Sequence, residues 1–274
     1  MKENKYNNSH FFSQYSQMSR SVEGLKGAGE WHVLQKMLPD FAGKRVLDLG
    51  CGFGWHCAYA IEHGATRVTG IDISEKMLEE AQKRNSSPLI EYQCMAIEDF
   101  DFQPDTYDIV ISSLTFHYLE SFTDICRKIN NCLTPGGTFV FSVEHPVFTA
   151  YGNQEWHYDQ DGKPIHWPVD RYFTEGRRTA VFLGEEVIKY HKTLTTYING
   201  LLQTGFEICE LIEPQPDERL LDTIPGIQYF SAPGNVEWNH SYYPVLLSPD
   251  FPISRDDLYD ALKAENIYSR RYFY

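Results

Sequence analysis

The distribution of apolar and polar positions predicts alternating strands and helices over the first half of the chain. An apolar run at residues 46–49 breaks at three closely spaced glycines, Gly50, Gly52 and Gly54. A helix-like segment follows, and a second apolar run ends at Asp72. Strand, glycine turn, helix and strand in this order are typical of a βαβ unit with a ligand site at its first turn.

The glycines and the acidic residue indicate the kind of ligand. A strand that turns sharply into a helix presents backbone N–H groups, and residues without a Cβ let a ligand approach them. Asp72 lies 22 residues after Gly50, at the end of the second predicted strand. An acid at this place suits the two hydroxyls of a ribose. We therefore expect a ligand that carries a ribose.

Further segments extend the alternating pattern. Residues 106–113 and 133–146 predict a fourth and a fifth strand, residues 206–212 predict a sixth, and a helix is expected over about 30–38, after a polar N-terminal arm. Residues 151–186 are rich in aromatic, charged and turn residues, which predicts an insertion. Because insertions at the carboxyl ends of strands cover the ligand crevice of open α/β sheets, we interpret this one as a substrate lid.

The glycine spacing separates two families of cofactor site. A dinucleotide fingerprint, G-x-G-x-x-G, would need glycine where the chain has Trp55. The pattern from Asp48 to Gly54 is instead D-x-G-x-G-x-G. It resembles the first motif of the class I, Rossmann-like S-adenosylmethionine-dependent methyltransferases, most of all their small-molecule branch. The resemblance covers about residues 12–225 and implies an α/β fold, a Rossmann-like sheet flanked by helices, with S-adenosyl-L-methionine as cofactor.

The same resemblance implies a set of cofactor-binding residues. Many members carry an acid after the third strand that accepts from the adenine amino group, and this chain has Ala96 there. We therefore expect adenine to meet backbone groups near Ile97, with Glu98, and apolar contacts. The full predicted set is Tyr15, Arg20, Asp48, Gly50, Cys51, Gly52, Gly54, Asp72, Ile73, Met77, Ala96, Ile97, Glu98 and Ser113. Tyr15 and Arg20 belong to it because, together with Met18, they resemble a segment that folds over the cofactor in related enzymes.

Three histidines are candidates for a catalytic base. The sulfonium of S-adenosylmethionine is already activated, so such an enzyme aligns a nucleophile with the methyl group, excludes water and, where needed, removes a proton. His117 follows the fourth predicted strand, His145 follows the fifth, and His191 lies further along the chain. Each of them could instead only orient a ligand or pack.

Composition narrows the class of partner. A formal charge of −14 and a pI near 5.1 disfavour nucleic acid as substrate. The six cysteines form no C-x-x-C pair, so we expect neither a metal site nor a disulfide framework. No segment resembles a signal peptide or a membrane span. We therefore predict a cytoplasmic enzyme that acts on a small-molecule methyl acceptor, without a membrane partner; the pattern does not determine its oligomeric state.

The last fifty residues depart from this family. Residues 224–274 resemble the C-terminal part of the pyridoxal-phosphate-dependent sugar aminotransferases of fold type I, but without that family's cofactor-binding core. We therefore divide the chain into a methyltransferase domain at 1–225 and an aminotransferase-like fragment at 226–274. A strand is predicted over 242–247 and a helix over 255–266. We expect the strand to pair with the core sheet in place of the hairpin strand that usually ends a methyltransferase, with Pro244 limiting it to an edge.

Two other functions stay open at this stage. One is a nicotinamide-dependent oxidoreductase, which Trp55 disfavours. The other is a protein that binds the cofactor without transferring a methyl group, because its C-terminus is replaced.

Overall fold

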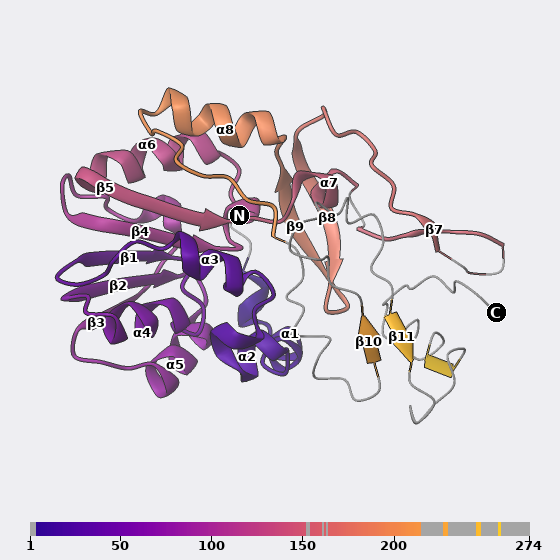
Figure 1. The fold of residues 1–274 in the computed structure, drawn as a ribbon, viewed down its shortest axis with the longest axis horizontal. Coiled ribbons are helices and arrows are strands. Elements are labelled where there is room, and N and C mark those ends of the chain that lie inside the picture. The colour runs from indigo at the N-terminus through magenta and orange to yellow at the C-terminus, as the bar shows by residue number, and fades with distance from the viewer. Residues whose placement is uncertain are drawn as a thin grey trace.

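A five-stranded parallel sheet forms the centre of the molecule. The computed structural model describes residues 4–151, 154–160, 162, 164–214, 227–229, 245–247 and 257–258. The strands lie in the order β3-β2-β1-β4-β5 (Figure 1). Their bounds are β1 Arg45–Leu49, β2 Arg67–Asp72, β3 Ile90–Cys94, β4 Tyr107–Ser113 and β5 Leu133–Ser142. The order reverses between β1 and β4, which is where ligands bind in sheets of this kind.

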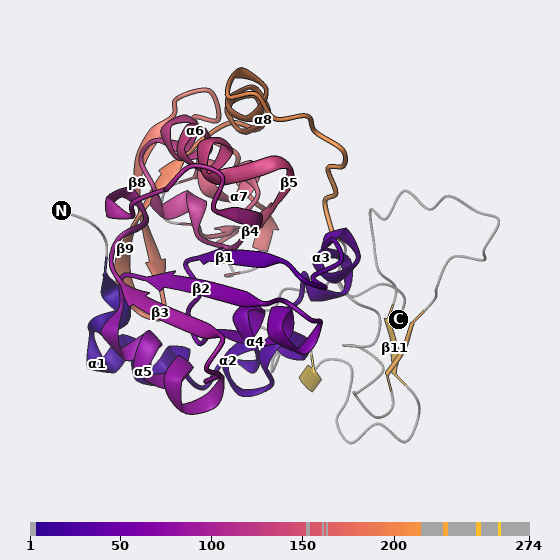
Figure 2. The same cartoon turned by 90° about the vertical axis from the view of Figure 1, so that its left-hand side faces the viewer.

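Alternation along the strands divides the core into two layers. Leu47 and Leu49 of β1 face a cluster with Phe122 and Ile129, whereas Val46 faces a cluster with Ala60. The first cluster packs under α6 (Phe122–Cys132) and α8 (Leu194–Gln203), and the second under α4 (Trp55–Glu62) and α5 (Glu75–Arg84). Figure 2 shows these two pairs of helices on either side of the sheet. The predicted α/β fold is confirmed.

The N-terminal arm folds into short helices that lie against α5. Its elements are η1 (Lys5–Asn7), α1 (Ser9–Tyr15), α2 (Ser19–Val22), η2 (Gly24–Gly27) and α3 (Trp31–Met37), the last confirming the helix predicted near 30–38. The side chain of Asn7 accepts from the Ser74 hydroxyl at 2.7 Å, and Lys76 donates to the Ser9 hydroxyl at 2.6 Å. These bonds hold the arm near the carboxyl end of β2.

The predicted insertion contains a β-hairpin. Helix α7 (Pro146–Ala150) is followed by the short strands β6 (His157–Tyr158) and β7 (Pro164–His166). Strands β8 (Gly176–Phe182) and β9 (Glu185–His191) then pair antiparallel, so the hairpin continues past the predicted end of the insertion at Glu186. Phe11 of the arm packs on Ala180 and Val187 of this hairpin. The arm and the hairpin therefore meet.

Two further elements carry residues of the site. They are η3 (Ile97–Asp99), which follows β3, and η4 (Phe116–Tyr118), which follows β4. Both begin at the carboxyl edge of the sheet, η4 beside the reversal of strand order and η3 at the outer strand β3.

The strand expected over 206–212 is not formed. Residues 206–214 have no regular secondary structure, although Phe206 and Ile208 still pack against the cluster under α6 and α8. Alternating apolar residues can be satisfied by such packing without a ladder of backbone hydrogen bonds, which is why the pattern misled the prediction. No helix in the described part of the chain is long and apolar enough to cross a membrane.

The prediction that the tail completes the core sheet is wrong for the residues that can be tested. Strand β11 (Val245–Leu247) pairs antiparallel with β10 (Ile227–Tyr229), and the core sheet contains neither. A partner closer in sequence closes a shorter loop, which favours this local pairing. Residues 242–244 lie outside the described residues, as does most of the helix predicted over 255–266, of which 257–258 are helical.

Candidate active site

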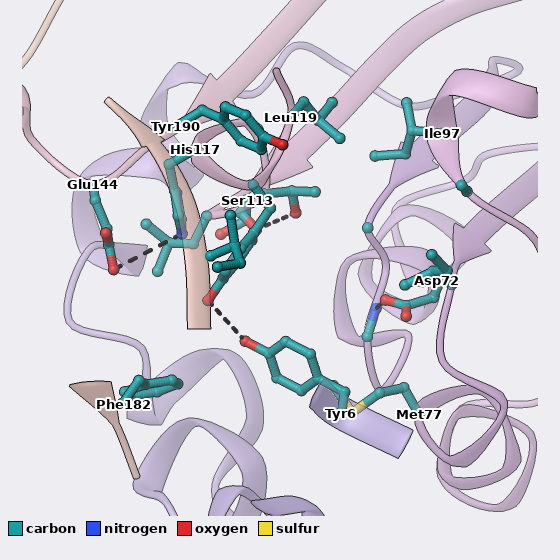
Figure 3. A pocket seen from close by; sticks show the side chains of 18 of the residues that line it. Tyr6, Asp72, Met77, Ile97, Ser113, His117, Leu119, Glu144, Phe182 and Tyr190 are labelled. Carbon is teal, nitrogen blue, oxygen red and sulfur yellow. Dashed lines mark hydrogen bonds and ion pairs between the residues drawn. The ribbon is translucent and has the colours of Figure 1, made fainter. Parts of the chain in front are cut away.

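A cavity of about 390 Å³ lies at the carboxyl edge of the sheet, where the strand order reverses. Its walls come from the glycine turn, the ends of β2 and β4, the N-terminal arm and the β8–β9 hairpin. In Figure 3, Asp72, Met77 and Ile97 lie at one end, Glu144, His117 and Phe182 at the other, and Tyr6 and Ser113 between them. The two ends differ in the chemistry of the residues that line them.

The glycine turn forms the floor of the first end. Gly50 has a φ of 76°, and a Cβ there would lie 2.2 Å from the Thr115 hydroxyl. Gly54 has a φ of 75°, and its Cβ would lie 2.1 Å from the Tyr92 hydroxyl. Both positions therefore exclude a side chain on two grounds, backbone conformation and space. Gly50 and Gly52 line the cavity, whereas Gly54 caps the start of α4 and does not.

Asp72 is the acidic group of this end. Its Oδ2 accepts from the Gly52 backbone N–H and its Oδ1 from the Ser74 N–H, each at 2.9 Å. Burial raises the pKa of Asp72 to about 6, against these two bonds, which lower it. A carboxylate oxygen has more than one lone pair, so each oxygen can still accept from a ligand hydroxyl.

Apolar side chains surround the space next to Asp72. Met77 and Ile97 are buried, and with Ile73 and Ala96 they line the cavity. Glu98 lines it too, and its backbone carbonyl accepts from Lys128 at 2.8 Å. The flat apolar space between these side chains suits a ring system.

Besides Gly54, two predicted cofactor residues lie outside the cavity lining. Asp48 is 1% exposed and faces α4, because even-numbered residues of β1 point to that side of the sheet. It accepts from the Cys57 thiol at 3.3 Å, and burial raises its pKa to about 7. Cys51 packs into the apolar cluster under α4. Both are buried next to the glycine turn, on the side of the sheet that faces α4.

The N-terminal arm closes the middle of the cavity. Tyr6, Tyr15 and Arg20 line it, with Met18. Arg20 pairs with Glu30 at 2.9 Å, and Glu30 also accepts from the Ser113 hydroxyl at 3.2 Å. The arm is thereby tied to the end of β4.

The second end centres on His117, which is 2% exposed and lies on η4. Its Nε2 lies 3.8 Å from Oε1 of Glu144, and within the described residues its buried Nδ1 has no hydrogen-bond partner. Burial lowers the pKa of His117 to about 4, although Glu144 opposes the shift. The imidazole is therefore neutral near pH 7.

Glu144 and the hairpin build the rest of this end. Glu144 follows β5 and accepts from the Lys189 ammonium of β9 at 2.6 Å. Phe182, Ile188 and Tyr190 of the hairpin supply apolar and aromatic surface.

A buried lysine fixes the turn that carries His117. The Lys192 ammonium donates to the backbone carbonyls of Leu119 and, at 3.2 Å, Tyr190. The η4 turn is thereby joined to the end of the hairpin.

The other two predicted histidines are not in the cavity lining. The side chain of His145 is 45% exposed, lies 2.5 Å from Glu213 through its Nε2 and caps α7 through its Nδ1. His191 is fully buried, and its two ring nitrogens contact Thr149 Oγ1 at 2.9 Å and the Tyr172 carbonyl at 2.7 Å. Both therefore have structural partners that account for their positions.

Sequence reasoning missed several residues of the second end. Glu144 precedes His145, and Tyr190 precedes His191, so in each case the neighbour of a chosen residue faces the cavity. Glu144 could have been found by asking which acids follow a predicted strand. No pattern in the sequence singled out Tyr6. Metal chemistry finds no support in the described ranges, where His, Cys, Asp and Glu form no group of three able to hold an ion.

Known methyltransferases resemble this chain in sequence and in structure. The methyltransferase domain family matches residues 47–141. A crystal structure of an S-adenosylmethionine-dependent methyltransferase from Mesorhizobium loti is 41% identical, with a TM-score of 0.68 over 74% of this chain and 92% of its own. A Listeria monocytogenes protein assigned provisionally to the same class is 59% identical, with a TM-score of 0.67 over 71% of this chain and 91% of its own.

Curated relatives extend the comparison. A Haemophilus influenzae protein of uncharacterised function is 33% identical over 216 residues, which cover 76% of this chain and 85% of that protein. A ubiquinone biosynthesis O-methyltransferase from Neisseria meningitidis is 35% identical over 108 residues, 38% of this chain. The match spans 45% of that enzyme, less than half of its length.

Proposed function

Because this chain belongs to the S-adenosylmethionine-dependent methyltransferases, we propose that its cavity holds the methyl donor at the Asp72 end and a small-molecule acceptor at the His117 end. The observation that carries the proposal is the division of one cavity into two ends of different chemistry. A carboxylate, a bare glycine turn and apolar side chains form the first end, and an imidazole with aromatic side chains forms the second.

The residues of the first end fit S-adenosylmethionine. Asp72 is placed to accept from the ribose hydroxyls, and Met77 and Ile97 are placed to enclose the adenine. The absence of Cβ at Gly52 leaves room for the amino-acid portion of the cofactor. The Arg20 guanidinium, which lines the cavity, would pair with the carboxylate of that portion. The sulfonium supplies an activated methyl group when bound. The protein contributes alignment and exclusion of water.

The second end fits a small acceptor. The whole cavity, which the donor and the acceptor would share, has a volume of about 390 Å³, so the space left beside the donor suits only a small acceptor. The formal charge of −14 disfavours a nucleic acid. The similarity to a ubiquinone biosynthesis O-methyltransferase supports a small-molecule acceptor as well.

In this proposal the β8–β9 hairpin forms a lid over the acceptor end of the cavity. Phe182, Ile188 and Tyr190 line the acceptor end, and the Lys189–Glu144 ion pair joins the hairpin to the segment that follows β5. We expect it to exclude water when an acceptor is bound.

The segment after about Ile224 remains a proposed aminotransferase-like fragment. Its support is the sequence resemblance and the extent of the structural matches, which cover 91–92% of the solved chains but 71–74% of this one. This chain therefore has an additional part. We assign it no catalytic role.

Calorimetric titration with S-adenosylhomocysteine, with NAD as comparison, tests the cofactor. Binding of S-adenosylhomocysteine and no binding of NAD is the expected result, and the reverse would reinstate the oxidoreductase. Transfer of labelled methyl from S-adenosylmethionine to a panel of phenols, amines and thiols tests the activity. Cofactor binding with no transfer to any class would instead favour a binding protein without catalysis.

A further inference from the structure

Three charged or titratable side chains form a series that ends at the acceptor end of the cavity. Lys189 is 2% exposed and donates to Glu144 at 2.6 Å and to the Gln154 side chain at 2.9 Å. Glu144 Oε1 lies 3.8 Å from His117 Nε2. The series runs cation, carboxylate, imidazole, from β9 through the residues after β5 to η4. Glu144 and His117 line the cavity (Figure 3), whereas Lys189 is not among the lining residues.

The charges in this series are balanced before any ligand binds. Burial alone raises the pKa of Glu144, but His117 and Lys189 lower it below its usual value, so Glu144 is ionised. For His117, burial lowers the pKa most, Glu144 raises it, and Lys189, Lys192 and Arg20 lower it further. The acceptor end therefore offers a neutral imidazole backed by an ion pair, in which the Glu144 carboxylate already has protein partners.

We propose, building on the methyltransferase function above, that the acceptor atom is the oxygen of a neutral hydroxyl compound such as a phenol or enol, and that His117 takes its proton while Glu144 is a positioning residue. A lone pair of the hydroxyl oxygen forms the bond to the methyl carbon. The carbon–sulfur bond breaks, and its electron pair stays on sulfur, giving S-adenosylhomocysteine. The hydroxyl proton passes to the imidazole of His117. The resulting imidazolium faces the carboxylate of Glu144, which stabilises its charge.

A weak base matches a hydroxyl acceptor better than an amine acceptor. An oxygen that gains a third bond becomes a strong acid, so even an imidazole with a pKa of about 4 can remove its proton. An aliphatic amine, once methylated, holds its proton with a pKa of about 10, like lysine, and would not release it to His117. A protonated amine beside His117 would also need a carboxylate acceptor there, whereas both oxygens of Glu144 already have protein partners, Lys189 and Gln154.

The test compares His117→Gln, Glu144→Gln and the control His145→Gln, whose side chain lies outside the cavity lining. Labelled methyl transfer is measured with phenols that are neutral at the assay pH, with 4-nitrophenol at a pH where it is ionised, and with matched benzylamines and thiophenols. For neutral phenols His117→Gln should lower kcat/KM by about 10²–10⁴-fold, and Glu144→Gln by a smaller factor. For the ionised phenol both losses should fall below about tenfold, because no proton remains to be removed. His145→Gln should stay within about twofold.

Binding gives a readout that does not depend on turnover. In the presence of S-adenosylhomocysteine, calorimetry should show phenol binding about tenfold more tightly than toluene, since one hydrogen bond to His117 is gained. His117→Phe should remove that preference, and the dissociation constant of S-adenosylhomocysteine should stay within about twofold.

Several results would overturn the proposal. Preferred methylation of benzylamines or thiols, failure of every phenol, or equal losses with neutral and ionised phenols would each do so, the last because it points to a structural role. Persistence of the phenol preference in His117→Phe would do so as well. Different results would refute the proposed methyltransferase function: S-adenosylhomocysteine would not bind, or no acceptor of any class would be methylated.

Discussion

Replacement of Asp72 by alanine is expected to weaken binding of S-adenosylhomocysteine by about 1.5–3 kcal/mol, roughly a 10- to 150-fold rise in Kd. The magnitude follows from the hydrogen bonds that two ribose hydroxyls would make to an ionised carboxylate, which are stronger than bonds between neutral groups. Asp72 is the group placed for them, at the cavity wall beside the glycine turn.

The same substitution tests whether the effect is local. Asp72→Ala removes the acceptors for the N–H groups of Gly52 and Ser74, which costs stability. It also removes a carboxylate whose burial raises its pKa to about 6, which offsets that cost at pH 8. We therefore expect a small change in Tm beside a large change in affinity.

Calorimetric titration at pH 8, where Asp72 is ionised, gives the Kd, and thermal unfolding of the same samples gives the Tm. Asp124→Ala is the matched control, since Asp124 lies on α6, is exposed and pairs with Arg127 at 2.8 Å. The assignment of Asp72 to the ribose is refuted when the folded Asp72→Ala protein binds S-adenosylhomocysteine within twofold of the parent protein.

Three further outcomes follow from the structure. Affinity for S-adenosylhomocysteine should fall as pH drops through about 6, by up to about tenfold per pH unit, because ribose bonds favour the ionised form of Asp72 and protons compete with them; a flat calorimetric profile from pH 8 to 5 would contradict this. Gly43→Ala should lower the free energy of unfolding by about 1–2 kcal/mol, because alanine is strained at its φ of 75° and a Cβ there would have no atom within 4 Å. Gly54→Ala has the same φ but should cost clearly more, because its Cβ would meet the Tyr92 hydroxyl; equal losses in urea unfolding would contradict this steric argument. A chain ending at Gly226 should keep its Tm within about 2 °C and its cofactor affinity, because β11 pairs with β10 and not with the core sheet; a clear loss in either measurement would show that the tail supports the core.

The parts of the fold that the sequence predicted are those with strong local signals. The apolar run of β1, the glycines after it and Asp72 at the end of β2 appear in the structure at the predicted places. Each depends on a few adjacent residues and a single backbone conformation. Residues 206–212 carry an equally apolar pattern but form no strand, because a strand also needs a partner, and the local pattern does not contain one.

The candidate site divides along the same line. Residues at strand ends, such as Asp72 and His117, could be placed on the cavity side because all parallel strands end at one edge. The sequence could not show which of two neighbouring residues faces the cavity: Glu144 lines the cavity and His145 does not. Asp48 was chosen for its place in the motif, yet the alternation along β1 turns it toward α4. Tyr6 reaches the cavity only through the folding of the whole arm, which no short pattern encodes.

The meeting of the arm and the hairpin has a kinetic consequence. Phe11 packs on Ala180 and Val187, and the Tyr6 and Tyr118 hydroxyls lie 3.3 Å apart, so two segments distant in sequence close over one cavity. We expect the proposed donor and acceptor to enter past these contacts, so that the rate at which the contacts open would limit turnover. Weakening the apolar contact at Phe11 would raise the exchange rates of donor and acceptor together, while a change at Asp72 or His117 would act on one ligand alone.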